Sequence, residues 1–138
     1  MILRIAYVSR AAAGVTQADV FDIIRVAHNR NRRNDLSGGL VFADGYFAQV
    51  LEGMPFQVRD RLARIALDPR HEAVDLRLET LVDQRLFAGE WMALRCADEI
   101  DPAVLGAQGY VAGLPASRFD GDVLVEFVKA CCTATVPA

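Results

Sequence analysis

The sequence predicts a single α+β domain whose strands and helices follow one another in the order βαββαβ. Short apolar runs typical of strands alternate with two segments in which apolar residues recur every three or four positions. An Asp44-Gly45 pair between two of these runs is the preferred sequence of a tight hairpin turn. At 138 residues and 53% hydrophobic, the chain suits one core and leaves no room for a second domain.

The first half of the chain is expected to form a strand, a helix and a hairpin. Residues 2–9 form the first strand, whose residues Leu3, Ile5 and Tyr7 share one face. A capping box at residues 16–19 begins a helix that ends at residues 34–35. Its buried face consists of Val20, Ile23, Ile24 and Ala27. Residues 38–42 and 46–52 flank the turn and therefore pair antiparallel.

The second half is expected to add a helix, two strands and two terminal helices. Pro55 suits the first turn of a helix that ends at residues 68–69 and buries Val58, Leu62 and Ile65. Residues 74–81 alternate as a fourth strand, and residues 91–95 form a fifth. A short helix begins at residues 101–102, and Asp120 caps a final one. The predicted buried stripe of that final helix is Val123, Leu124, Phe127, Val128 and Cys131.

This order of elements is that of the ferredoxin-like arrangement, an antiparallel sheet with both helices on one face. We expect the terminal helices to cover the other face of the sheet. The sequence offers no linker, repeat or low-complexity tract.

Gln49 is the first indication of a function, because it lies within a strand that is otherwise apolar on both faces. A buried primary amide costs about 1–3 kcal/mol unless its donors and its carbonyl find partners. Tyr7 in the first strand and Asn31 late in the first helix are positioned to supply them. Taken singly, a strand tyrosine with its hydroxyl at water and an asparagine helix cap are ordinary features. Converging on one cavity, the three side chains would bind a planar heteroaromatic ligand.

Basic residues gather on both predicted helices: Arg25, Arg30, Arg32 and Arg33 on the first, and Arg59, Arg61 and Arg64 on the second. Each cluster is explained by a solvated face and by favourable charge near a helix C-terminus. The alternative is that the two clusters hold a phosphate-bearing ligand between the helices.

Composition argues against several classes of function. A net charge of −3 favours neither nucleic acid nor acidic membranes. The three cysteines lack framework spacing, and no Cys/His cluster has the spacing of metal ligands. No nucleophile and base are singled out for a catalytic triad, and no apolar run approaches the roughly 18–20 residues of a membrane span. We expect a reduced, soluble, cytoplasmic protein that is not an enzyme and binds no metal.

Several motifs occur together over roughly the first 95 residues. They are AYVSR at residues 6–10, Asn31 ahead of LSGGL at 36–40, DGYFAQVLEG at 44–53, DPRH at 68–71, and RLF at 85–87 before Trp91-Met92. In this order and at these spacings, the chain resembles the BLUF domain, the blue-light sensor that uses flavin. The resemblance implies a photosensory domain at residues 1–97 and a helical extension at 98–138 packed on it.

The resemblance also implies a flavin, FAD or less typically FMN, between the two helices. Asn31 would hold the polar edge of the ring, and Gln49 would bridge the ring and Tyr7. The remaining positions that match cofactor contacts are Arg30, Phe47, Ile65, Arg70 and His71. Light would drive electron and proton transfer from Tyr7 through Gln49 and back. Gln49 would then be rotated or tautomerised, with a stronger hydrogen bond to the ring and a small red shift in absorption.

By the same resemblance, we expect a bacterial photoreceptor that forms a homo-oligomer and signals to a separate, unidentified protein. One alternative is a ferredoxin-like interaction module that has lost its response to light. An acylphosphatase-type hydrolase would need a phosphate-cradling loop after the first strand, which residues 9–14 do not resemble.

The fifth strand departs from the family pattern. Glu90 occupies the usual place of a tryptophan, Trp91 follows it, and Met92 keeps its distance from Phe87. If Met92 faces the flavin, strand alternation puts Glu90 on the same face and Trp91 on the opposite one. We expect these three residues to carry the signal from the site.

Overall fold

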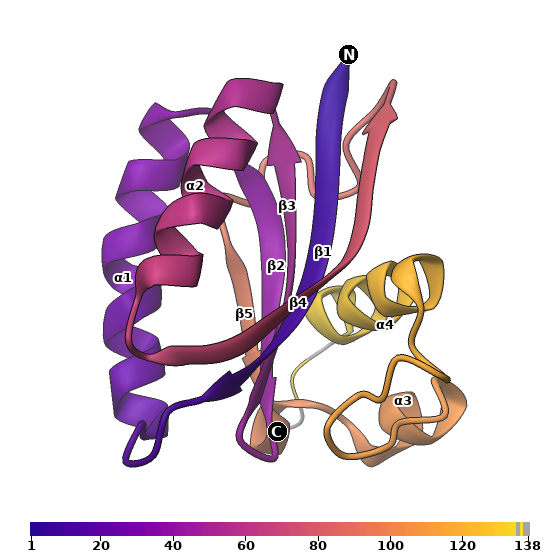
Figure 1. The fold of residues 1–138 in the computed structure, drawn as a ribbon. Coiled ribbons are helices and arrows are strands. Elements are labelled where there is room, and N and C mark those ends of the chain that lie inside the picture. Colours follow the sequence, from indigo (N-terminus) through magenta and orange to yellow (C-terminus); the bar gives the residue numbers. More distant parts are fainter. Residues whose placement is uncertain (135, 137–138) are drawn as a thin grey trace.

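The computed structural model of the protein describes residues 1–134 and 136. Its mixed five-stranded sheet has the order β4-β1-β3-β2-β5 (Figure 1). The strands are β1 (Ile2–Ala11), β2 (Ser37–Ala43), β3 (Tyr46–Gly53), β4 (His71–Val82) and β5 (Ala93–Cys96). β1 to β4 pair antiparallel, and β5 runs parallel to β2. The predicted ferredoxin-like arrangement with an added fifth strand is confirmed.

Helices cover both faces of this sheet. Figure 1 shows α1 (Gln17–Arg33) and α2 (Pro55–Leu67) on one side and α4 (Gly121–Thr133) on the other. A single turn of 3-10 helix, η1 (Ala97–Glu99), and the short helix α3 (Pro102–Ala107) precede α4. The predicted placement of the terminal helices is therefore correct. Residues 135, 137 and 138 of the predicted extension lie outside the described residues.

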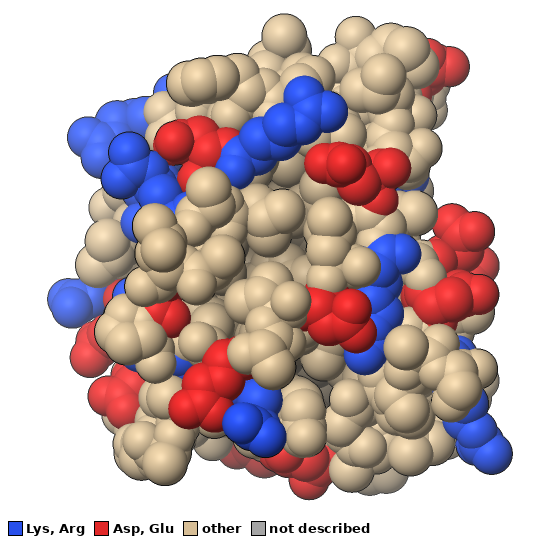
Figure 2. All heavy atoms as spheres, viewed as in Figure 1, with Lys and Arg blue, Asp and Glu red and all other residues tan. Residues whose placement is uncertain are grey.

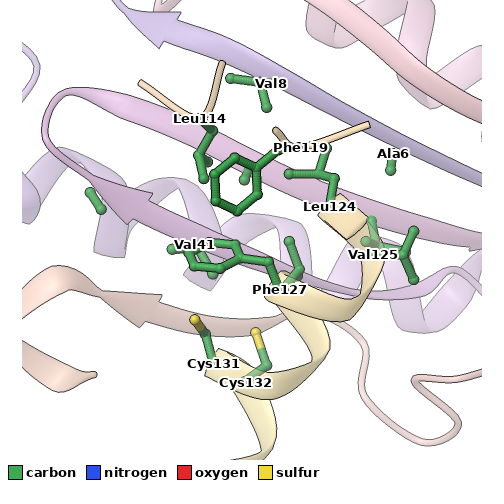
Figure 3. Packing of buried hydrophobic residues seen from close by; sticks show 14 of the residues in the cluster. Ala6, Val8, Val41, Leu114, Phe119, Leu124, Val125, Phe127, Cys131 and Cys132 are labelled. Atoms are coloured by element: carbon green, nitrogen blue, oxygen red, sulfur yellow. The ribbon is translucent and has the colours of Figure 1, made fainter. Parts of the chain in front are cut away.

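The alternation of β1 and β3 divides the core into two clusters. Leu3, Ile5 and Tyr7 face α1 and α2. Ala6 and Val8 face α4, where they pack with Leu124, Phe127 and their neighbours (Figure 3). Because successive strand residues point to opposite faces, residues that are adjacent in β1 serve different cores.

Local signals act as the sequence predicts at the ends of the elements. The Thr16 side chain accepts from the Asp19 amide, and the Asp19 carboxylate accepts from the Thr16 amide, which completes the capping box of α1. Asp44 and Gly45 have φ angles of 52° and 78°, so both adopt the left-handed conformation that a tight hairpin needs. This turn sets the β2–β3 register, in which Leu40 lies opposite Gln49.

Three expectations about element boundaries and burial need correction. β5 begins at Ala93, so Trp91 and Met92 precede the strand. β4 starts at His71, three residues earlier than the alternation pattern indicates. In α4, Val123 is exposed while Val125 and Cys132 are buried, because the face that packs on the sheet is turned toward Val125 and Cys132 relative to the predicted stripe.

Charge is mixed on the face of the molecule that Figure 2 shows. On the face seen in Figure 2, Lys and Arg side chains lie among Asp and Glu side chains. Within residues 1–134 and 136, no helix combines the length and the apolar character that crossing a bilayer requires.

Candidate functional site

A cavity of about 470 Å³ lies between α1, α2 and the sheet. Its lining comes from α1, from β2 and β3, from α2 and the turn that follows it, and from the first residue of β4. The lining residues are Asp22, Ile23, Ile24, Arg25, Val26, Ala27, Arg30, Asn31, Leu40, Phe47, Gln49, Arg61, Arg64, Ile65, Asp68, Arg70 and His71. The structure thus brings together all of the residues that the sequence analysis assigned to cofactor contacts.

Tyr7 reaches this cavity through Gln49. The two residues lie directly opposite each other in the β1–β3 register, and the Tyr7 hydroxyl donates a hydrogen bond to Gln49 Oε1. Burial, reinforced by the negative charge of Asp68, strongly raises the pKa of Tyr7, so the phenol is neutral. Gln49 Nε2 donates in turn to the sulfur of Met92 over 3.3 Å. Since a primary amide has two N–H donors, Gln49 Nε2 retains one that the Met92 sulfur does not use.

Asn31 carries an unsatisfied acceptor. Asn31 is only 2% exposed, and its Nδ2 donates to the carbonyl oxygen of Trp91 over 3.0 Å. Among the described residues, Asn31 Oδ1 has no hydrogen-bond partner. A buried acceptor without a partner costs about 1–3 kcal/mol. The oxygen is therefore suited to a donor group on a ligand in the adjoining cavity.

Two arginines concentrate positive charge in the cavity wall. Arg30 Nε and Arg61 Nε are buried and lack partners, and neither side chain forms an ion pair within the described part of the chain. Burial, with the nearby charges of Arg61 and Arg64, lowers the pKa of Arg30. Burial and Arg64 lower the pKa of Arg61 in the same way. An anionic group between the two helices would relieve this repulsion.

His71 lies opposite Ala11, the last residue of β1, and its ring is next to that of Phe47. Its ring centroid is 4.5 Å from that of Phe47, and its Nδ1 is 2.7 Å from Ser9 Oγ. Burial lowers the pKa of His71. The neighbouring Arg70 lines the cavity, but its guanidinium is engaged by the Asp68 carboxylate at 2.9 and 3.1 Å.

Residues 90–92 do not follow the alternation expected of a strand. Met92 is buried against Gln49, Trp91 is half-buried, and Glu90 is exposed. The expectation that Glu90 shares a face with Met92 is wrong, because β5 has not begun there and the Glu90 carbonyl instead accepts from the amide of Gly38 over 2.9 Å. Solvent therefore reaches the Glu90 carboxylate.

Sequence reasoning missed two buried polar residues, Ser9 and Glu52. Ser9 follows Tyr7 by two positions in β1, so strand alternation indicates that it faces the same side. Glu52 is fully buried at the end of β3. Its position within a strand that is apolar elsewhere is the same signal that drew attention to Gln49.

Comparisons with known proteins identify the family of this chain. The family described as "Sensors of blue-light using FAD" (BLUF) matches residues 2–93. Subunit beta of the photoactivated adenylate cyclase of Euglena gracilis is 30% identical over 96 residues, covering 70% of this chain and 11% of that protein. The chain thus spans about a tenth of the length of such curated relatives.

Solved structures show the same fold along nearly the whole chain. BlsA in its photo-activated state has a TM-score of 0.84 at 21% identity, covering 100% of this chain and 99% of BlsA. BlrB, a BLUF protein in its dark state, has a TM-score of 0.77 at 21% identity, covering 96% and 97% of the two chains. Since the family match extends over more than half of the sequence, this chain belongs to the BLUF family of blue-light sensors.

Proposed function

We propose that this protein senses blue light with a flavin held non-covalently in the cavity between α1 and α2. The observation that carries the proposal is the Tyr7–Gln49 hydrogen bond, which ends at a cavity also lined by Asn31, whose Oδ1 has no partner among the described residues. A redox-capable phenol, an amide that both donates and accepts, and a second amide meet at one ligand-sized space. None of these groups is a nucleophile or a general base.

The cavity residues suit a flavin in three respects. Asn31 Oδ1 would accept from the imide N–H of the ring, and Gln49 Nε2 would donate to a ring carbonyl. Leu40, Phe47 and Ile65 would contact its apolar surface. Arg30 and Arg61 would hold the phosphates, which supports a phosphorylated flavin. We expect FAD, with FMN as the alternative.

The ring supplies a chromophore for blue light that becomes a strong oxidant when excited. With a flavin bound and excited, Tyr7 would give up an electron to the ring and its phenolic proton to Gln49 Oε1, which already accepts from that hydroxyl. The electron and the proton later return to Tyr7. Gln49 would remain rotated or tautomerised, and a stronger hydrogen bond from it to the ring carbonyl would give a small red shift. The dark state recovers thermally.

We further propose that the protein acts as a sensor without catalysis of its own and passes its signal to a separate protein. The relatives with long chains are photoactivated adenylate cyclases by name, which supports coupling between a sensor of this kind and an effector. A homo-oligomer, a bacterial origin and a cytoplasmic location are further expectations. The division into a sensor at residues 1–97 and an extension at 98–138 belongs to the same proposal.

An absorption spectrum of the purified protein before and after blue illumination tests the proposed function. We expect bound flavin, a reversible red shift and thermal recovery in the dark. Flavin with an unmoved spectrum, or colourless protein that does not take up added FAD, would instead support the light-insensitive interaction module. Denaturing release of the cofactor followed by chromatography distinguishes FAD from FMN.

A further inference from the structure

A fully buried carboxylate lies at the end of β3. Glu52 is 0% exposed, and three donors surround its two oxygens. Oε1 accepts from the backbone amide of Phe87 over 2.9 Å, and Oε2 accepts from the amide of Leu86 over 3.0 Å and from Arg4 Nε over 2.8 Å. A buried ionic group is costly unless its hydrogen-bonding capacity is met, and here all three contacts are charge-assisted.

Two of those donors belong to the strap, the name we give to residues 84–92 of the connection between β4 and β5. Arg4 Nη2 also donates to the carbonyl of Gln84 over 3.1 Å, and Arg85 reaches Ser37 Oγ over 2.9 Å. The start of the strap is therefore tied to β1, β2 and β3 by charged side chains. Further along the strap, the backbone amide of Gly38 donates to the carbonyl of Glu90 over 2.9 Å.

The end of the strap forms part of the candidate site. The Trp91 carbonyl accepts from Asn31 Nδ2, and the Met92 sulfur accepts from Gln49 Nε2. Phe87 belongs to the core on the α4 side, whereas Met92 belongs to the core on the side of α1 and α2. The strap thus passes from one face of the sheet to the other, with Glu52 holding one end and the two site amides contacting the other.

We propose that Glu52 is a positioning residue for the photochemical site, because it fixes the strap that brings Met92 to Gln49 and the Trp91 carbonyl to Asn31. This inference rests on the proposed function. Met92 favours the Gln49 orientation whose Nε2 points toward sulfur. A displaced strap would weaken that preference, and the rate at which the site returns to its dark state would change.

Glu52→Gln is the sharpest single change. The amide keeps the size of the side chain, but its NH₂ group cannot accept, so the Leu86 or Phe87 amide loses its partner. Because this variant also leaves Arg4 without its buried counter-charge, the double variant Arg4→Gln/Glu52→Gln accompanies it and removes both members of the pair. Glu79→Gln is the matched control, since that carboxylate is exposed on β4 and pairs only loosely with Arg59 at 3.7 Å.

Dark recovery after a blue flash is measured in each variant, with and without Met92→Ala. In the Met92 background, Glu52→Gln or the double variant should change the recovery rate by about fivefold or more, the equivalent of one ordinary hydrogen bond. With Met92→Ala present, the same substitution should have a much smaller effect, because Glu52 acts through Met92. Glu79→Gln should recover like the wild type. Unchanged recovery, or an equal change in both backgrounds, would overturn the proposal.

Amide hydrogen exchange provides a readout that needs no light. The Leu86 and Phe87 amides should be protected in the wild type and in Glu79→Gln, and should exchange much faster in Glu52→Gln or the double variant. Equal protection in all proteins would refute the anchoring role even if no photoshift occurs. Conversely, lost protection in a protein that shows no photoshift would support the anchor and contradict only the proposed light response.

Discussion

Gln49 Nε2 lies 3.3 Å from the sulfur of Met92, while Oε1 of the same amide accepts from the hydroxyl of Tyr7. The two contacts fix which end of the amide faces which neighbour. A thioether can accept weakly but cannot donate, so Met92 favours the orientation in which nitrogen faces sulfur. Light-driven rotation or tautomerisation of Gln49 would have to act against this preference. Met92 thereby links the bridging amide to the strap.

The first prediction concerns the donor and the bridge. Tyr7→Phe and Gln49→Leu should each retain flavin but lose the photoshift, because each removes one member of the proton path while nearly preserving volume. Loss of the buried hydrogen bond should also cost about 1 kcal/mol of unfolding free energy. Absorption difference spectra after blue illumination measure the first effect, and urea titration measures the second. A normal photocycle in Tyr7→Phe would overturn the mechanism.

The second prediction separates binding from photochemistry. Asn31→Ala should weaken flavin retention by about five- to thirtyfold, the equivalent of about 1–2 kcal/mol, because the acceptor for the ring imide is lost. Asn29→Ala is the matched control, since Asn29 lies on the same helix and is exposed. Titration of the flavin-free protein with FAD, followed by fluorescence, gives the dissociation constants. Equal affinities in the two variants would show that Asn31 does not contribute to flavin binding.

Most of the fold could be predicted because its signals are local. The capping box at Thr16 and the turn at Asp44-Gly45 set the limits of the elements on either side. Once the turn fixes the β2–β3 register and the strands alternate, Gln49 can only face the side of α1 and α2, where Tyr7 also points. Alternation within each strand thus predicts that the two side chains share a face, whereas their direct opposition depends on the long-range β1–β3 register.

The strap could not be predicted in the same way. Residues 90–92 carry no alternating pattern, and their path is set by contacts with Gly38, Asn31 and Gln49, which are distant in the sequence. The contacts of Glu52 are also long-range, because its partners come from β1 and from the strap. Neither periodicity nor propensity reports such contacts.

The third prediction concerns residues 90–92, the end of the strap that departs from the family pattern. Met92→Ala should change the dark-recovery rate or the downstream structural response, because Met92 contacts Gln49. Trp91→Phe should alter the photoshift and recovery little, since the site uses the backbone carbonyl of residue 91, which phenylalanine keeps. Glu90→Trp would restore the family's residue at an exposed position and tests whether new contacts alter recovery. Strong sensitivity at Trp91 with none at Met92 would rule out this arrangement.

The last prediction concerns His71 and the pH dependence of stability. Burial lowers the pKa of His71, and Arg70 adds to this effect while Asp68 opposes it. The unfolded chain therefore takes up a proton near the ordinary value of about 6.5, whereas the folded protein does so only at lower pH. Because the unfolded state binds more protons in this window, the free energy of unfolding should fall as the pH decreases from about 7.5 to about 5.

Replacing the imidazole should flatten this dependence. Urea titrations of His71→Gln at several pH values should show a smaller loss of stability below about pH 6.5 than the wild type. The Asp68 carboxylate does not contribute in this window, because its own pKa is lowered, chiefly by the hydrogen bond from Arg70, and its stabilising effect is lost only in stronger acid. His28→Gln changes an exposed histidine of α1 and serves as the control, which should keep the wild-type slope. Equal slopes in the wild type and His71→Gln would show that protonation of His71 is not coupled to folding.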